Sequence, residues 1–159
     1  MSYLIKQCGL TLIELIVVLA IVSVLAAVAV PSYRESISSS KRLEAQTALA
    51  ALAVAVERHY SAQQPPSYAN ASASSLLAEY TPIGGNTTSE TATYRLCVVD
   101  RGDSASGSSC PTKDSATDYA LIALPLNAQA ADRCGALKLT DTGAKSVSGG
   151  SSSEAECWK

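Results

Sequence analysis

The chain has 159 residues, of which 47% are hydrophobic and 16% charged, and its formal net charge is -2 at pH 7. That length fits one membrane segment and one small domain, and it excludes an arrangement of several large domains. A slightly acidic chain has no broad basic field, so its charge does not support nucleic-acid binding.

Residues 1–9 form a short segment that carries one basic side chain, Lys6. An almost wholly apolar run follows and continues to Tyr33. At a rise of ~1.5 Å per residue, the roughly 21 residues from Leu10 to Val30 reach about 30 Å, the thickness of a hydrocarbon layer. The run is therefore predicted to cross a membrane as a helix.

Glu14 is an unusual residue for such a segment. Inserting its carboxylate into a bilayer costs on the order of 2.5 to 3.5 kcal/mol, so a partner is expected. A cut between Gly9 and Leu10 would supply one, because the new amino group of Leu10 is a cation at the positive end of the helix dipole.

Residues 9–14, with the sequence GLTLIE, and the apolar run after them resemble the class III signal of type IV pilins and pseudopilins. The resemblance implies that a prepilin peptidase cleaves between Gly9 and Leu10 and methylates the nitrogen of Leu10. The family usually has phenylalanine at the position of Leu10. Pro31 and Tyr33 also match the family, and Pro31 is expected to kink the helix without ending it.

Two other kinds of signal fit this segment less well. A secretory signal peptide would use Lys6 as its basic region and residues 27–29 as its cleavage site, but Glu14 interrupts the apolar core. A lipoprotein signal would use Cys8, but the apolar stretch would have to precede that cysteine.

A second helical period follows the membrane segment, over residues 41–60. Apolar residues recur on one face at steps of three and four, at Ala45, Leu49, Leu52, Val56 and Tyr60. The helix is therefore expected to lie half-buried against the domain. The pair Lys41-Arg42 is interpreted as part of its solvated face. His59 is interpreted as a surface residue, since no residues at metal-ligand spacing accompany it.

Pro65 and Pro66 are expected to end this helix, and a loop of small polar residues then runs to Glu90, with a turn at residues 84–86. Four segments have the composition of β-strands or hairpin arms, at residues 93–99, 119–124, 135–140 and 145–147. The predicted fold class is α+β, with a long kinked N-terminal helix packed on an antiparallel sheet of three or four strands.

Removal of the leader would leave an even number of cysteines, Cys97, Cys110, Cys134 and Cys157. In a translocated domain these indicate two disulfides, for which three pairings exist.

The C-terminal part of the chain also resembles a family pattern. Residues 132–135, the pair Gly143 and Lys145, and the end at residues 157–159 are similar to the C-terminal block of PilE-like minor pilins. In pilins that block holds a C-terminal disulfide loop, which implies Cys134 with Cys157. Cys97 with Cys110 then encloses the other loop rich in glycine and serine.

The two resemblances imply a structural, minor subunit of a type IV pilus. The expected parts are a leader at residues 1–9, a transmembrane and assembly half of the helix at residues 10–33, and a periplasmic domain at residues 34–159. The chain would cross the inner membrane once and then enter an extracellular fibre. There Glu14 is expected to pair with the methylated N-terminus of a neighbour, and the fibre would support pilus biogenesis, twitching motility and adhesion.

The expected partners are other pilin subunits, the prepilin peptidase, the inner membrane and the pilus assembly machinery. No cofactor or metal is expected. A type II secretion pseudopilin and a pilus-displayed adhesin or DNA-uptake pilin stay open as alternatives, as does a major subunit. A membrane-anchored enzyme is not expected, because the chain has one histidine and no recognisable nucleophile motif.

Overall fold

The computed structural model describes residues 11–77, 83, 92–104 and 109–158. The chain forms two compact units, of which the first ends at Ile37 and the second begins at Ser38. Helix α1, Leu12–Ala62, contributes residues to both units. The predicted cleavage site at residues 9–10 and the predicted turn at residues 84–86 lie outside the described residues.

Helix α1 begins after Thr11, whose hydroxyl accepts a hydrogen bond from the backbone N–H of Glu14 at 3.3 Å. This acceptor satisfies one of the donors that a helix N-terminus leaves unpaired. The helix continues without a break through the serine-rich residues 36–40 and ends at Ala62. Two prolines, at residues 65–66, follow this end closely, as the sequence predicted.

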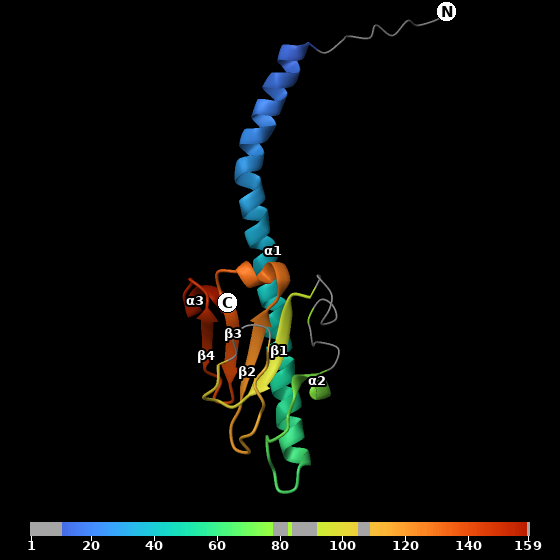
Figure 1. Cartoon of the computed structure of the whole chain (residues 1–159), viewed down its shortest axis with the longest axis vertical. Coiled ribbons are helices and arrows are strands. Elements are labelled where there is room, and N and C mark those ends of the chain that lie inside the picture. Colours follow the sequence, from blue (N-terminus) through green and yellow to red (C-terminus); the bar gives the residue numbers. More distant parts are fainter. Residues whose placement is uncertain (1–10, 78–82, 84–91, 105–108, 159) are drawn as a thin grey trace, which may run out of the picture. The chain divides into compact units, whose positions relative to one another are not determined.

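The second unit contains a four-stranded antiparallel sheet in the order β1-β2-β3-β4, which confirms the predicted fold class (Figure 1). Its strands are β1, Tyr94–Val99; β2, Ala120–Pro125; β3, Gly135–Thr140; and β4, Lys145–Gly149. The turn between β3 and β4 needs a left-handed residue, which Gly143 supplies at φ 78°. Strands that are consecutive in sequence are therefore neighbours in the sheet.

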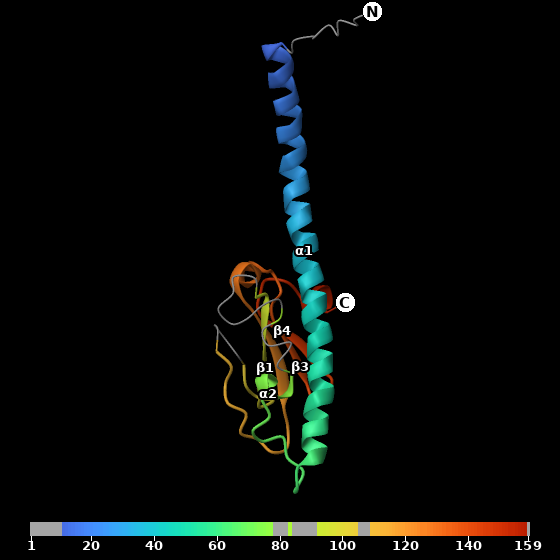
Figure 2. The same ribbon diagram turned by 90° about the vertical axis from the view of Figure 1, so that its right-hand side faces the viewer.

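The sheet lies against the second half of α1 in both views (Figures 1 and 2). Four of the apolar residues predicted for the buried face of α1 are fully buried, and the fifth, Tyr60, is half-buried. The facing side of the sheet contributes Tyr94, Leu96, Val98, Leu121 and Leu137. A smaller apolar cluster on the opposite face of the sheet contains Cys97, Val99, Ala120, Ile122, Leu124 and Ala136.

Arg42 does not lie on a solvated face of α1, so that interpretation of the sequence was wrong. Its guanidinium forms an ion pair with Asp132 at 2.5 Å, and the two side chains are 6% and 2% exposed. One turn further along, the side-chain amide of Gln46 donates to the backbone carbonyl of Cys157 at 2.7 Å. Polar contacts therefore join α1 to two segments near the C-terminus.

Both predicted disulfides are present in the structure. Cys97 is joined to Cys110, and Cys134 is joined to Cys157 across 23 positions of sequence. The second of these loops passes close to the start of β3, because a Cβ on Gly150 would lie 2.3 Å from the carbonyl oxygen of Arg133. Only glycine permits this approach of two backbones.

Three short helices were not predicted: α2, Ala73–Leu76; η2, Asn127–Ala131; and α3, Glu154–Cys157. Two of them depend on local serine caps. Ser72 accepts from the backbone N–H of Ser75 at 3.3 Å, and Ser153 forms a capping box with Glu156. Each helix is too short to give a periodic apolar pattern.

Candidate functional site

The first unit presents an apolar helical surface to its surroundings. The leucine, isoleucine and valine side chains from Leu12 to Val30 are 46% to 77% exposed. An 18-residue window of α1 has a mean hydropathy of 2.9, and none of it is buried within the chain. Apolar surface of this extent requires a cover, either lipid or another protein.

Glu14 lies in the first turn of this helix and is the only charged residue between residues 11 and 33. The N-terminal end of the helix dipole favours a carboxylate at this position. The polar side chain of Ser23, by contrast, is satisfied within the helix, because its hydroxyl donates to the carbonyl of Leu19. Glu14 is therefore the charged residue on this otherwise uncharged helical surface.

Pro31 lies inside α1, and the helix continues past it as predicted. Proline has no backbone N–H, so the hydrogen bond that would run from residue 31 to the carbonyl of Ala27 cannot form. The kink expected at this position stays a prediction.

Two cations near the ends of β1 and β3 in the second unit are paired with carboxylates. Arg101 forms an ion pair with Asp141. The ammonium of Lys113 lies 2.7 Å from Asp100, and its side chain is 1% exposed. The hydrogen bond from Lys113 lowers the pKa of Asp100, and the hydrogen bond to Asp141 raises the pKa of Arg101. These cations contribute little free positive charge.

Three tyrosines gather around the last turns of α1. Glu57 accepts hydrogen bonds from the hydroxyls of Tyr68 at 3.1 Å and Tyr119 at 2.8 Å. The rings of Tyr60 and Tyr68 stack with their centroids 4.3 Å apart. Burial, followed by the hydrogen bond to Glu57, raises the pKa of Tyr68 to about 12 and raises that of Tyr119 further. This cluster attaches the end of α1 to the loop that follows it.

The predicted site residues fall in separate parts of the chain. Gly9 and Leu10 lie outside the described residues, Glu14 and Pro31 lie in the first unit, and the four cysteines form two disulfides in the second. His59 is half-buried, with its Nε2 3.4 Å from the carbonyl of Ala69. Within the part of the chain that the structure describes, no three metal-binding side chains come together.

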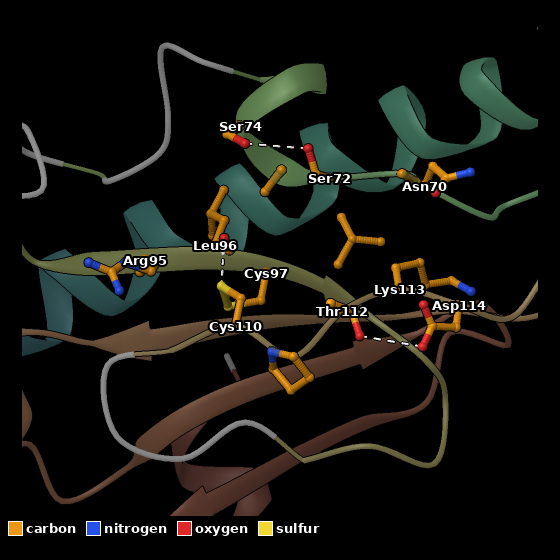
Figure 3. Close-up of a pocket in the computed structure, with 14 residues that line it drawn as sticks. Asn70, Ser72, Ser74, Arg95, Leu96, Cys97, Cys110, Thr112, Lys113 and Asp114 are labelled. Carbon is orange, nitrogen blue, oxygen red and sulfur yellow. Dashed lines mark hydrogen bonds between the residues drawn. A yellow bond between two sulfur atoms is a disulfide. The ribbon is translucent and has the colours of Figure 1, made fainter.

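Sequence reasoning also missed a cavity of about 550 Å³ beside β1 (Figure 3). It is lined by residues 70–74, 95–98 and 110–114. These three segments are distant in sequence and individually resemble ordinary loops and a strand, so no local pattern indicates that they meet.

Two family models match the chain. Residues 31–138 match the model described as "Type IV minor pilin ComP, DNA uptake sequence receptor". Residues 4–30 match the model of the prokaryotic N-terminal methylation motif.

Individual proteins are similar to this chain either over a short segment or at low sequence identity. The type IV major alpha-pilin of Moraxella bovis is 47% identical over 51 residues, which are 32% of this chain and 32% of that protein. The chain thus matches about a third of the length of this curated relative. A solved type IV pilin from Shewanella oneidensis has 22% identity and a TM-score of 0.44, with 77% of this chain and 98% of that chain covered.

Proposed function

Because the chain belongs to the family of type IV minor pilins described by the ComP model, we propose that its apolar helix and Glu14 join it to other pilins in a fibre. Family membership makes it a pilus subunit with pilins as its partners. The observation that carries the proposal is the exposed apolar part of α1, residues 12–30, whose only charged residue, Glu14, lies in the first turn.

The role of Glu14 follows from the energetics of such a helix. When an apolar helix leaves lipid and packs on similar helices, the apolar driving force changes little. A carboxylate that meets a cation in this dry contact can then set the register between subunits. The proposed cation is the methylated amino group of Leu10 on a neighbouring subunit.

This role requires a processed N-terminus. We propose that a prepilin peptidase cleaves between Gly9 and Leu10 and methylates Leu10, and the match of residues 4–30 to the methylation motif supports this. The intact mass of the membrane-purified protein should lack residues 1–9 and include one added methyl group. A mature N-terminus near Val30 would instead indicate a secretory signal peptide and refute the proposal.

The test of assembly compares Glu14→Ala with Glu44→Ala, a control on an exposed position of the same helix. The Glu14 variant should be processed and inserted at least as well as the wild type, since removal of the charge relieves an insertion cost. It should accumulate in the inner membrane and enter sheared pili poorly, because a broken dry ion pair typically costs ~3 to 5 kcal/mol. Equal incorporation of both variants would show that Glu14 does not set the register.

A second candidate function is binding of double-stranded DNA during uptake, which the description of the matching family model favours. The net charge of -2 and the pairing of Arg101 and Lys113 with carboxylates give the chain no broad positive field, so we expect few phosphate contacts. Binding should therefore depend weakly on salt, with a slope of log K against log salt well below the ~10 of a strongly basic binder.

Fluorescence anisotropy with a duplex carrying a candidate uptake sequence, and with a scrambled duplex, tests this second function. A preference for the uptake sequence that persists as salt is raised would support specific recognition. Equal affinity for the two duplexes, lost at moderate salt, would indicate nonspecific attraction and refute it.

A further inference from the structure

The two disulfides of the second unit differ in their access to solvent. Cys134 and Cys157 are 0% and 2% exposed and belong to the main apolar core. Cys97 is 1% exposed, but its partner Cys110 is an exposed residue. Both Cys97 and Cys110 also line the cavity beside β1 (Figure 3). Of the two described disulfides, this second one therefore presents a cysteine to solutes.

Burial also distinguishes the two sulfurs of this disulfide as targets. In thiol–disulfide exchange a thiolate attacks one sulfur and the other sulfur leaves. Cys97 lies opposite Ile122 in the sheet and packs in the smaller apolar cluster, so a thiolate would reach its sulfur only through buried side chains. Cys110 lies in the connection between β1 and β2, where solvent reaches it. Attack is therefore expected at Sγ of Cys110, with Cys97 as the leaving sulfur.

The cavity offers room for a small thiol beside Cys110. Its volume is about 550 Å³, and hydroxyl groups, two cations and a carboxylate line it, at Ser72, Ser74, Thr112, Arg95, Lys113 and Asp114. Lys113 is paired with Asp100, so its charge is already balanced. A wall that mixes hydroxyl groups with charges of both signs suits a small zwitterionic thiol, such as cysteine or glutathione.

The connection after β1 keeps other attachments when this disulfide opens. Asp100 directly follows β1, and its Oδ1 accepts from the ammonium of Lys113 at 2.7 Å and from the backbone N–H of Ser115 at 2.8 Å. All six residues of β1 are also paired with β2. The domain should therefore stay folded while the bond to Cys110 is exchanged.

We propose that Cys110 is a site of reversible modification by small zwitterionic thiols. The thiolate of such a molecule attacks Sγ of Cys110 and forms a new S–S bond, while the bond between Cys97 and Cys110 breaks. The electron pair of the broken bond leaves with the sulfur of Cys97, which takes a proton from water. In the return reaction the Cys97 thiolate attacks Cys110 and expels the small thiol, so no further oxidant or reductant is needed. This site is independent of the roles proposed for Glu14 and for DNA.

The test exposes the full-length processed protein, in detergent micelles without denaturant, to excess reduced glutathione at about pH 8, where part of a thiol is ionised. Acid stops the exchange, and mass spectrometry of pepsin peptides then locates the adduct. Glutathione should be found on Cys110 and a free thiol on Cys97. The disulfide between Cys134 and Cys157 should react at least ~100-fold more slowly, because it requires local unfolding. The fluorescence of Trp158, which packs against the core, should stay unchanged.

Two matched variants test whether the attack occurs beside the cavity. Thr112 lines the cavity two positions from Cys110, Thr117 lies in the same connection outside it, and both threonines are exposed. The added carboxylate of Thr112→Glu should repel the incoming thiolate and slow the exchange about threefold at low salt, with recovery as salt is raised. Thr117→Glu should react like the wild type. Both variants should unfold at the wild-type denaturant concentration.

Four results would overturn the proposal. Glutathione found on Cys97 would place the attack at the buried sulfur, and equal rates for the two disulfides would show that burial does not separate them. A change in Trp158 fluorescence during exchange would show that the domain opens, which makes the disulfide a structural staple. Exchange with a protein thiol of the Cys-x-x-Cys class, in a parallel reaction, but not with glutathione would assign Cys110 to a protein partner.

Discussion

The buried ion pair between Arg42 and Asp132 makes a quantitative prediction about the second unit. We expect Arg42→Met to lower the free energy of unfolding by about 3 to 5 kcal/mol, the typical cost of leaving one partner of a buried pair charged and alone. The structure favours the upper part of this range. One carboxylate oxygen of Asp132, Oδ2, is buried without a hydrogen-bond partner, and the other, Oδ1, is paired with Arg42. Loss of the guanidinium would therefore remove the ion pair of Oδ1 while Oδ2 is already unpartnered.

The double variant Arg42→Met with Asp132→Leu should recover at least ~2 kcal/mol of this loss, because apolar side chains of similar size often replace a buried pair without cost. Urea unfolding of the full-length protein in micelles can follow Trp158, the only tryptophan, which packs against the core. Lys41→Met is the matched control, since it removes a neighbouring cation that is less buried; its effect should stay within ~0.5 kcal/mol.

Two results would refute this reasoning. If the effects of the two single variants simply add in the double variant, Arg42 and Asp132 do not stabilise the domain through each other. If Arg42→Met unfolds like Lys41→Met, the arginine is accessible to water in solution and the pair is not buried.

Three further predictions concern the same unit. Replacing Cys134 and Cys157 by serine should cost about 3 kcal/mol, as expected for a loop spanning 23 positions, and an equal midpoint with and without reductant in the wild type would contradict this. Leu49→Ala should cost ~2 to 5 kcal/mol in the same urea assay, because Leu49 is fully buried between α1 and the sheet, and a cost below ~1 kcal/mol would show that the site collapses. Burial raises the pKa of Tyr94 to about 12, so its share of the stability should be complete below pH ~10, the pKa of an unfolded tyrosine, and be lost toward pH 12. Tyr94→Phe should make this alkaline decline shallower, and an unchanged decline would contradict the shift.

Much of the fold could be predicted because its signals are local. The helical period placed Ala45, Leu49, Leu52 and Val56 on a face that the structure buries. The β-forming segments lie within one or two residues of the observed strand ends, since turn residues bound each of them. The cysteine pairing came from resemblance to a family, because spacing alone left three pairings open.

What could not be predicted depends on contacts between distant residues. Arg42 and Asp132 are 90 positions apart, so the composition of the helix gave no sign that this arginine is buried. The cavity beside β1 likewise combines three segments whose separate patterns are unremarkable loops and a strand. The candidate site on the first unit was easier to recognise, because a single carboxylate in an apolar run is visible in the sequence itself.

The contacts between α1 and the C-terminal segments have a mechanical consequence. The strands run beside α1 in Figures 1 and 2, so tension along this helix would load its contacts with the sheet in shear, and several must break together. Gln46 holds the carbonyl of Cys157, and Cys157 is covalently joined to Cys134 at the start of β3. Force applied to the helix would therefore pass to a cross-linked part of the sheet.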